Sequence, residues 1–137
     1  MEALNYSCRS LVDKIGKMPK DFTKQDIINL VISENIRHIN FQYPAGDGRL
    51  KTLNFVINNA AYLEEILSCG ERVDGSSLFP FIEASSSDLY VVPRFRTAYM
   101  DPFCELPTLN FLCSFFDKDG NPLESSPEYT LHKACEA

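Results

Sequence analysis

Basic residues are scarce in this sequence, which has 13 Lys and Arg against 19 Asp and Glu and a formal net charge of −6. They are also scattered along the chain. A protein that binds a nucleic-acid backbone needs clustered Lys and Arg, because binding is driven by the release of counterions from the phosphates. No apolar run approaches the roughly 18 residues of a membrane-spanning helix, and the amino terminus lacks the basic start and apolar stretch of a secretion signal. These absences predict no nucleic-acid partner, no membrane association and a cytoplasmic location.

The five cysteines include no CxxC pair and no histidine at metal-ligand spacing. An odd count with such spacing is unlike a disulfide framework or a zinc site. We therefore expect reduced, mostly buried thiols and no metal-binding residues in this chain. The two histidines, His38 and His132, lack the neighbours that would define a catalytic set.

Length and hydrophobic content, 137 residues and 45%, suit a folded domain with its own core. Apolar residues at helical spacing predict amphipathic helices over 4–15, 23–36 and 59–69. Period-two alternation and β-branched or aromatic runs predict strands over 38–43, 50–57, 89–92, 97–100 and 109–116. Ser126, followed by proline and glutamate, predicts the start of a last helix. This order predicts an α+β fold with a grasp-like mixed sheet and packed helices.

One segment lacks a predicted element. Residues 74–88 hold five serines, a proline and a glycine, which predicts a long loop of the kind that compact domains keep for function. At its start, Asp74-Gly75-Ser76-Ser77 presents one carboxylate and two hydroxyls. From chemistry alone a capped turn explains these residues better than a binding site does, because Asx-turns are common and a single carboxylate is weak evidence for a site.

Several short motifs follow one another along the chain: Val73-Asp74-Gly75-Ser76-Ser77, then Ser87-Asp88-Leu89, then Pro93 and Asp101-Pro102-Phe103. In their order and spacing these motifs resemble the amino-terminal domain of glutamine synthetase. The resemblance covers roughly residues 21–137. It implies a leader over residues 1–20, a β-grasp domain over 21–125, and over 126–137 the start of a helix leading to an absent catalytic domain.

The resemblance also implies an activity, that of an ATP-dependent ligase joining ammonia to glutamate. Asp74 matches an aspartate that helps to bind ammonium and to take its proton, and Ser77 matches a serine lining the same corner. ATP and Mg or Mn would belong to the full-length enzyme, and we expect this chain alone to bind neither and to be inactive. Its implied partners are its own catalytic domain and the neighbouring subunit of a homo-oligomeric ring, with ammonium and glutamate as substrates.

Three departures from the family pattern leave other functions open. Phe79-Pro80 replaces a smaller pair and predicts a bulkier, stiffer loop, Ser86 replaces a common glutamate, and Arg94 replaces a common aspartate. One alternative is a γ-glutamyl-amine (polyamine) ligase of the same superfamily. The other is a non-catalytic, ubiquitin-like binding module, which the expected unfinished final helix disfavours.

Overall fold

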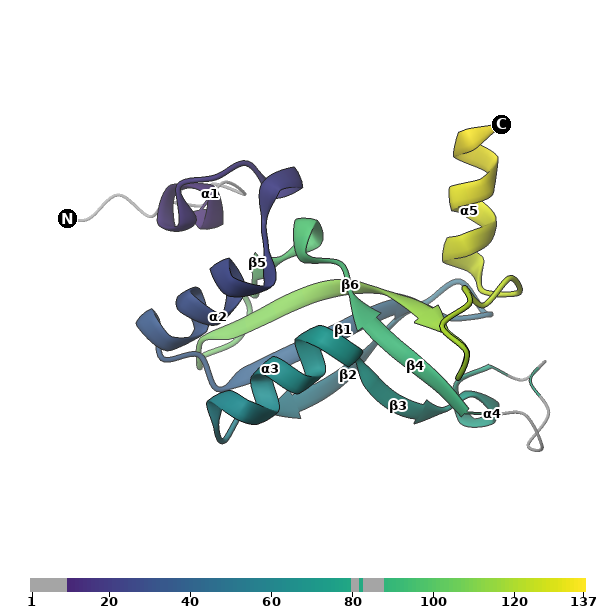
Figure 1. Ribbon diagram of the computed structural model, residues 1–137, viewed down its shortest axis with the longest axis horizontal. Coiled ribbons are helices and arrows are strands. Elements are labelled where there is room, and N and C mark those ends of the chain that lie inside the picture. Colours follow the sequence, from purple (N-terminus) through teal and green to yellow (C-terminus); the bar gives the residue numbers. More distant parts are fainter. Residues whose placement is uncertain (1–9, 80–81, 83–87) are drawn as a thin grey trace.

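The structure is a computed structural model that describes residues 10–79, 82 and 88–137. In chain order its elements are α1 (Ser10–Ile15), a 3-10 turn (Pro19–Asp21), α2 (Lys24–Ser33), β1 (His38–Pro44), β2 (Leu50–Val56), α3 (Ala60–Cys69), β3 (Glu71–Asp74), α4 (Gly75–Leu78), β4 (Asp88–Pro93), a second 3-10 turn (Phe95–Thr97), β5 (Tyr99–Met100), β6 (Thr108–Phe116) and α5 (Pro127–Glu136). Figure 1 shows these elements along the chain.

Among the described residues, six strands form one mixed sheet in the order β2-β1-β6-β4-β3, with β5 added beside β6. β1 and β6, the first and last strands, are parallel neighbours, and the other pairs are antiparallel. β3 is therefore an edge strand that pairs only with β4. The α+β class and the grasp-like mixed sheet expected from the sequence are confirmed.

One face of the sheet carries the core. Its buried side chains come from alternate positions of the central strands, as the two-residue period requires: Ile39, Phe41 and Tyr43 of β1, and Leu109, Phe111, Cys113 and Phe115 of β6. α2 and α3 lie over this face (Figure 1) and bury Ile27, Leu30, Val31, Leu63, Ile66 and Leu67 against it. The helices thus turn one apolar stripe each toward the strands.

The opposite face is crossed by a row of hydrogen-bonded side chains. Asn54 of β2 donates to Asn40 (2.6 Å), Asn40 to Asn110 (2.9 Å), and Asn110 to the carboxylate of Asp101 (3.1 Å). Asp101 also accepts from the backbone amide of Phe103. The bonds from Asn110 and then Phe103 lower the pKa of Asp101. The row supplies hydrogen-bond partners for Asn40 and Asn110, whose side chains are buried. Burying these amides without partners would destabilise the fold.

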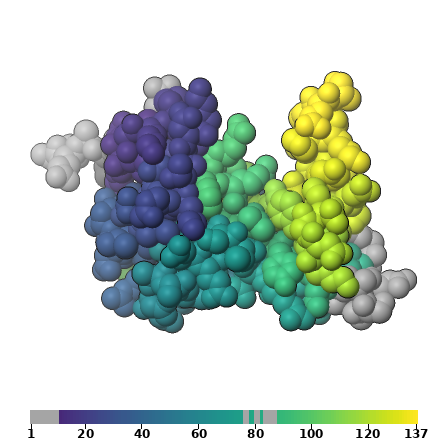
Figure 2. Space-filling view, viewed as in Figure 1, coloured from purple at the N-terminus to yellow at the C-terminus, as the bar shows by residue number. Residues whose placement is uncertain are grey.

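α5 stands beside this second face. A groove between them is lined by Pro44, Leu50 and Leu112 of the sheet and by Leu131 and Cys135 of α5. Figure 2 shows α5 projecting from the body of the domain, and none of its residues is buried.

The observed helix starts agree closely with those predicted from the sequence. Thr23 caps α2 in a capping box with Asp26, Asn59 caps α3, and Ser126 caps α5, each accepting a backbone amide. Gly70 ends α3 with a φ of +74°. Of the first predicted helix, the structure shows Ser10–Ile15, and the rest lies outside the described residues.

Three expectations were wrong. Residues 71–74 form the unpredicted strand β3, and residues 75–78 are helical rather than loop. The predicted strand 97–100 is shorter than expected, because Thr97 belongs to a 3-10 turn and only Tyr99–Met100 form β5. The described cysteines are free thiols, but only Cys113 is buried, while Cys69, Cys104 and Cys135 are exposed. Helix positions turn Cys69 and Cys135 outward, and Cys104 lies in an exposed loop.

Candidate functional site

Asp74 stands at a strand-to-helix junction on the edge of the sheet. It is the last residue of β3 and is exposed to solvent. Buried Gly75 follows and begins α4, which also contains Ser77. The backbone therefore places both sequence-predicted site residues at one corner of the domain, far along the sheet from α1 and α2 (Figure 1).

Phe79 fixes the segment that follows this corner. Its side chain is fully buried and packs edge-to-face on Tyr43 and Phe115, with ring centroids 5.8 and 5.1 Å away. Tyr43 and Phe115 also contact each other, at 5.2 Å, so three rings meet in one cluster. The backbone amide of Phe79 donates to the carbonyl of Gly75, which closes the turn of α4. Phe79, noted in the sequence as a bulky departure, is thus a core residue that ties α4 to the central strands.

An ion pair lies beside Asp74 on the same face of the sheet. In the β3–β4 ladder, Asp74 is opposite Asp88 and Arg72 is opposite Tyr90. A guanidinium nitrogen of Arg72, Nη2, lies 2.7 Å from Oδ2 of Asp88. Hydrogen bonding to Asp88 and its charge raise the pKa of Arg72, so the cation is kept. Sequence reasoning missed this pair because β3 had not been predicted.

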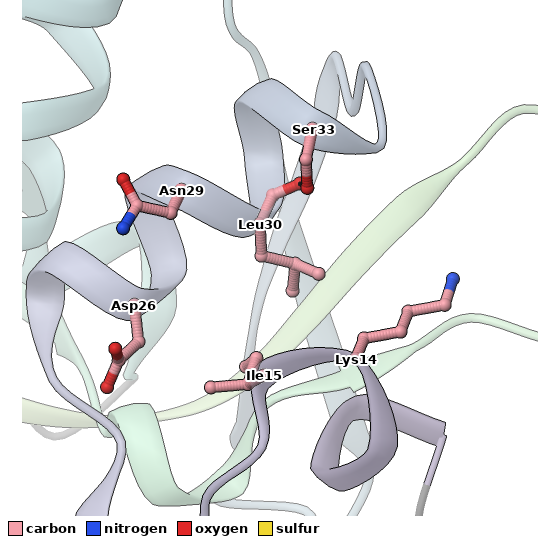
Figure 3. Close-up of a pocket in the computed structure, with 6 residues that line it drawn as sticks. All are labelled: Lys14, Ile15, Asp26, Asn29, Leu30 and Ser33. Atoms are coloured by element: carbon pink, nitrogen blue, oxygen red, sulfur yellow. Dashed lines mark hydrogen bonds between the residues drawn. The ribbon is translucent and has the colours of Figure 1, made fainter.

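A second hollow lies between α1 and α2, and its one carboxylate has a structural role. It is lined by Lys14 and Ile15 of α1 and by Asp26, Asn29, Leu30 and Ser33 of α2. Figure 3 shows Leu30 pointing toward the end of α1 where Ile15 lies. The carboxylate of Asp26 is already engaged by the Thr23 backbone amide and by Lys17 (3.0 Å), which lower its pKa. This carboxylate therefore caps a helix and joins two segments.

Neither a metal cluster nor a membrane span is found in the part of the chain that the structure describes. Its His, Cys, Asp and Glu side chains nowhere gather in a group of three that could hold a metal ion. None of its helices has the length and apolar character needed to cross a membrane.

The acidic turn at Asp117–Asn121 is closed by its own hydrogen bonds. The carboxylate of Asp117 accepts the backbone amides of Asp119 and Asn121.

Comparisons with known proteins identify the family. The family described as glutamine synthetase, β-grasp domain, matches residues 35–118. The glutamine synthetase of Staphylococcus epidermidis RP62A is 30% identical over 119 residues, spanning 85% of this chain and 26% of that protein. The enzyme of Staphylococcus aureus Mu50 is 29% identical over the same shares.

Solved structures agree on the fold. The cryo-EM structure of Plasmodium falciparum glutamine synthetase superposes with a TM-score of 0.72 at 17% identity, covering 84% of this chain and 22% of that one. A GmaS complex with ADP gives a TM-score of 0.67 at 11% identity, covering 77% and 24%. The chain belongs to the glutamine synthetase β-grasp domain family, as the sequence motifs predicted. It spans about a quarter of the length of the curated relatives it matches.

Proposed function

We propose that this chain is the amino-terminal domain of a glutamine synthetase and contributes Asp74 to an ammonium site at a subunit interface. The family match over residues 35–118, which includes Asp74 and its junction, carries this proposal. The exposed position of Asp74 at the sheet edge supports it, because a carboxylate offered to another surface must be accessible. Ser77 in α4 lines the same corner in this proposal. The matches do not favour a polyamine ligase or a binding module.

The proposed reaction requires two properties of the Asp74 carboxylate, a negative charge and a basic oxygen. Its negative charge attracts ammonium, and its basic oxygen then accepts a proton, because only neutral ammonia has the lone pair that attacks an activated acyl group. One carboxylate can perform both steps in sequence. The proton leaves nitrogen for a carboxylate oxygen of Asp74, and the free lone pair of nitrogen is then available to form the amide bond.

The remaining parts of the reaction belong outside the described residues. The family implies ATP and Mg or Mn, and the described part of this chain holds no group of three side chains that could bind the metal ion, so no step here depends on it. In this proposal they bind to a catalytic domain, which together with the neighbouring subunit of a homo-oligomer is the partner of the domain. By itself the 137-residue chain would then lack ligase activity.

The test is Asp74→Ala in the complete enzyme to which we assign this domain. Amide formation should fall by about 10²- to 10⁴-fold, the usual cost of losing a general base. ATP and glutamate binding, measured by calorimetry, should stay near wild type because other groups hold these substrates. Asp119→Ala, which removes another exposed aspartate from a surface turn, is the matched control and should leave the rate unchanged. Equal rates for the two variants would refute the assignment.

A subunit-mixing experiment tests the interface. Asp74→Ala chains are co-assembled with chains that lack a catalytic-domain metal ligand. If Asp74 serves the neighbouring subunit, some mixed interfaces join an intact aspartate to an intact catalytic domain, and activity returns. Mixed assemblies that form but stay as inactive as their parents would show that Asp74 does not act across the interface.

A further inference from the structure

The rung of the β3–β4 ladder that carries Asp74 places two negatively charged side chains opposite each other. Asp74 and Asp88 are directly opposite each other, and both are exposed. Cross-strand neighbours on one face have Cβ atoms only about 4.5 to 5.5 Å apart, and like charges in this relation destabilise the pair. This rung is also the end of the described ladder, on an edge strand of four residues. Strand ends open most readily, so the repulsion acts where the sheet resists it least.

Arg72 is placed to cancel this repulsion. It lies two residues before Asp74, so their side chains share one face of the sheet. From there its guanidinium reaches diagonally to Asp88, at 2.7 Å. We propose that Arg72 is a positioning residue, which holds and neutralises the Asp88 carboxylate so that the rung carrying Asp74 stays closed.

An exposed ion pair of this kind contributes little to global stability, since the two side chains are 64% and 54% exposed. Its effect is therefore local, at the end of one ladder. If this rung opens, the Asp74 carboxylate loses its fixed place relative to α4. Resting on the function proposed above, Arg72 acts on ammonium use through Asp74, without contact with the substrate.

Amide hydrogen exchange on the 137-residue chain tests the mechanism directly. Arg72→Ala should speed exchange at residues 73–74 and 88–89 by about two- to fivefold at low salt, the range expected for an exposed cross-strand charge pair. Exchange in β1 and β6 should be unchanged. Arg72→Lys, which keeps the positive charge, should behave like wild type.

The decisive variants concern Asp88. Asp88→Asn removes both the ion pair and the repulsion, so alone it should leave exchange at the rung near the wild-type rate. In the Arg72→Ala background it should restore slow exchange, because a neutral amide no longer repels Asp74. Fast exchange in the double variant, or in Asp88→Asn alone, would overturn the proposal, as would an unchanged rung in Arg72→Ala.

Kinetics of the complete enzyme connect the rung with the site. Arg72→Ala should raise the KM for ammonium severalfold and leave the KM for glutamate and ATP unchanged, and Asp88→Asn should reverse the effect. The exchange experiment does not involve ligase activity, so its failure overturns the role of Arg72 alone. Failure of Asp74→Ala to affect the reaction overturns the proposed function and leaves the exchange result standing.

Discussion

Phe79→Ala is the most informative test of how the site is attached to the fold. Phe79 follows α4 directly and is fully buried between Tyr43 and Phe115. If α4 belongs to the cooperative core, truncating this ring should destabilise the whole domain. If α4 only rests against the surface of the domain, losing the contacts of the Phe79 ring would change the free energy of unfolding little.

The expected magnitude follows from the packing. Truncation of a buried Phe to Ala costs about 3 to 5 kcal/mol through lost transfer energy and the cavity left behind. Phe79 also takes part in two edge-to-face pairs, which place its truncation in the upper part of that range. We therefore expect a loss of about 4 to 5 kcal/mol in the free energy of unfolding. With a urea m-value of about 2 kcal/mol/M for a domain of this size, the midpoint of unfolding should fall by about 2 M.

Urea denaturation followed by circular dichroism measures the shift. The matched control is Phe103→Ala, since Phe103 is 95% exposed and its truncation should change stability by less than about 0.5 kcal/mol. Phe79→Leu keeps most of the apolar volume and should lie between the two. A midpoint for Phe79→Ala equal to that of Phe103→Ala would refute the assignment of α4 to the core.

Three further measurements test other parts of the structure. Gly70→Ala should cost about 2 to 4 kcal/mol in urea denaturation, because φ is +74° and a Cβ would lie 2.3 Å from the carbonyl oxygen of Val91. Gly48→Ala, with a similar φ but open space around it, should cost only about 1 kcal/mol. The pKa of Asp101 is lower in the folded state, so the stability that its hydrogen bonds supply is present above the unfolded pKa and is lost as pH falls through the folded value. Asp101→Asn should therefore show a shallower fall of Tm below about pH 4. Cys113 is buried, which raises its thiol pKa, so a thiol reagent followed by mass spectrometry should label it only after unfolding, and the exposed cysteines before.

Local signals explain what the sequence could predict. The starts of α2, α3 and α5 are set by Thr23, Asn59 and Ser126, whose side chains accept amides within the same turn. The hairpin of β1 and β2 follows from alternation on either side of a glycine turn. Asp74 could be singled out as a candidate site residue through a resemblance in short motifs, although the strand and the helix that meet there were not predicted.

The features that sequence reasoning missed depend on distant partners. Residues 71–74 alternate in burial but contain three charged side chains, so their pairing with β4 has no local signal. Phe79 lies in a serine-rich segment, and only contact with β1 and β6 makes it a core residue. The exposure of Cys104 likewise depends on how its loop leaves the sheet, which composition does not encode.

The position of Asp74 on an edge strand is compatible with a fixed geometry because it is constrained at both ends. Before β3, Gly70 allows the chain to approach β4 more closely than any residue with a Cβ could. After Asp74, Phe79 anchors the chain in the core. A short, charged edge strand also resists pairing with other chains, which leaves its end available to a specific partner surface. A carboxylate held in this way is exposed without depending on a loop for its position, which is the arrangement that the shared site proposed above would require.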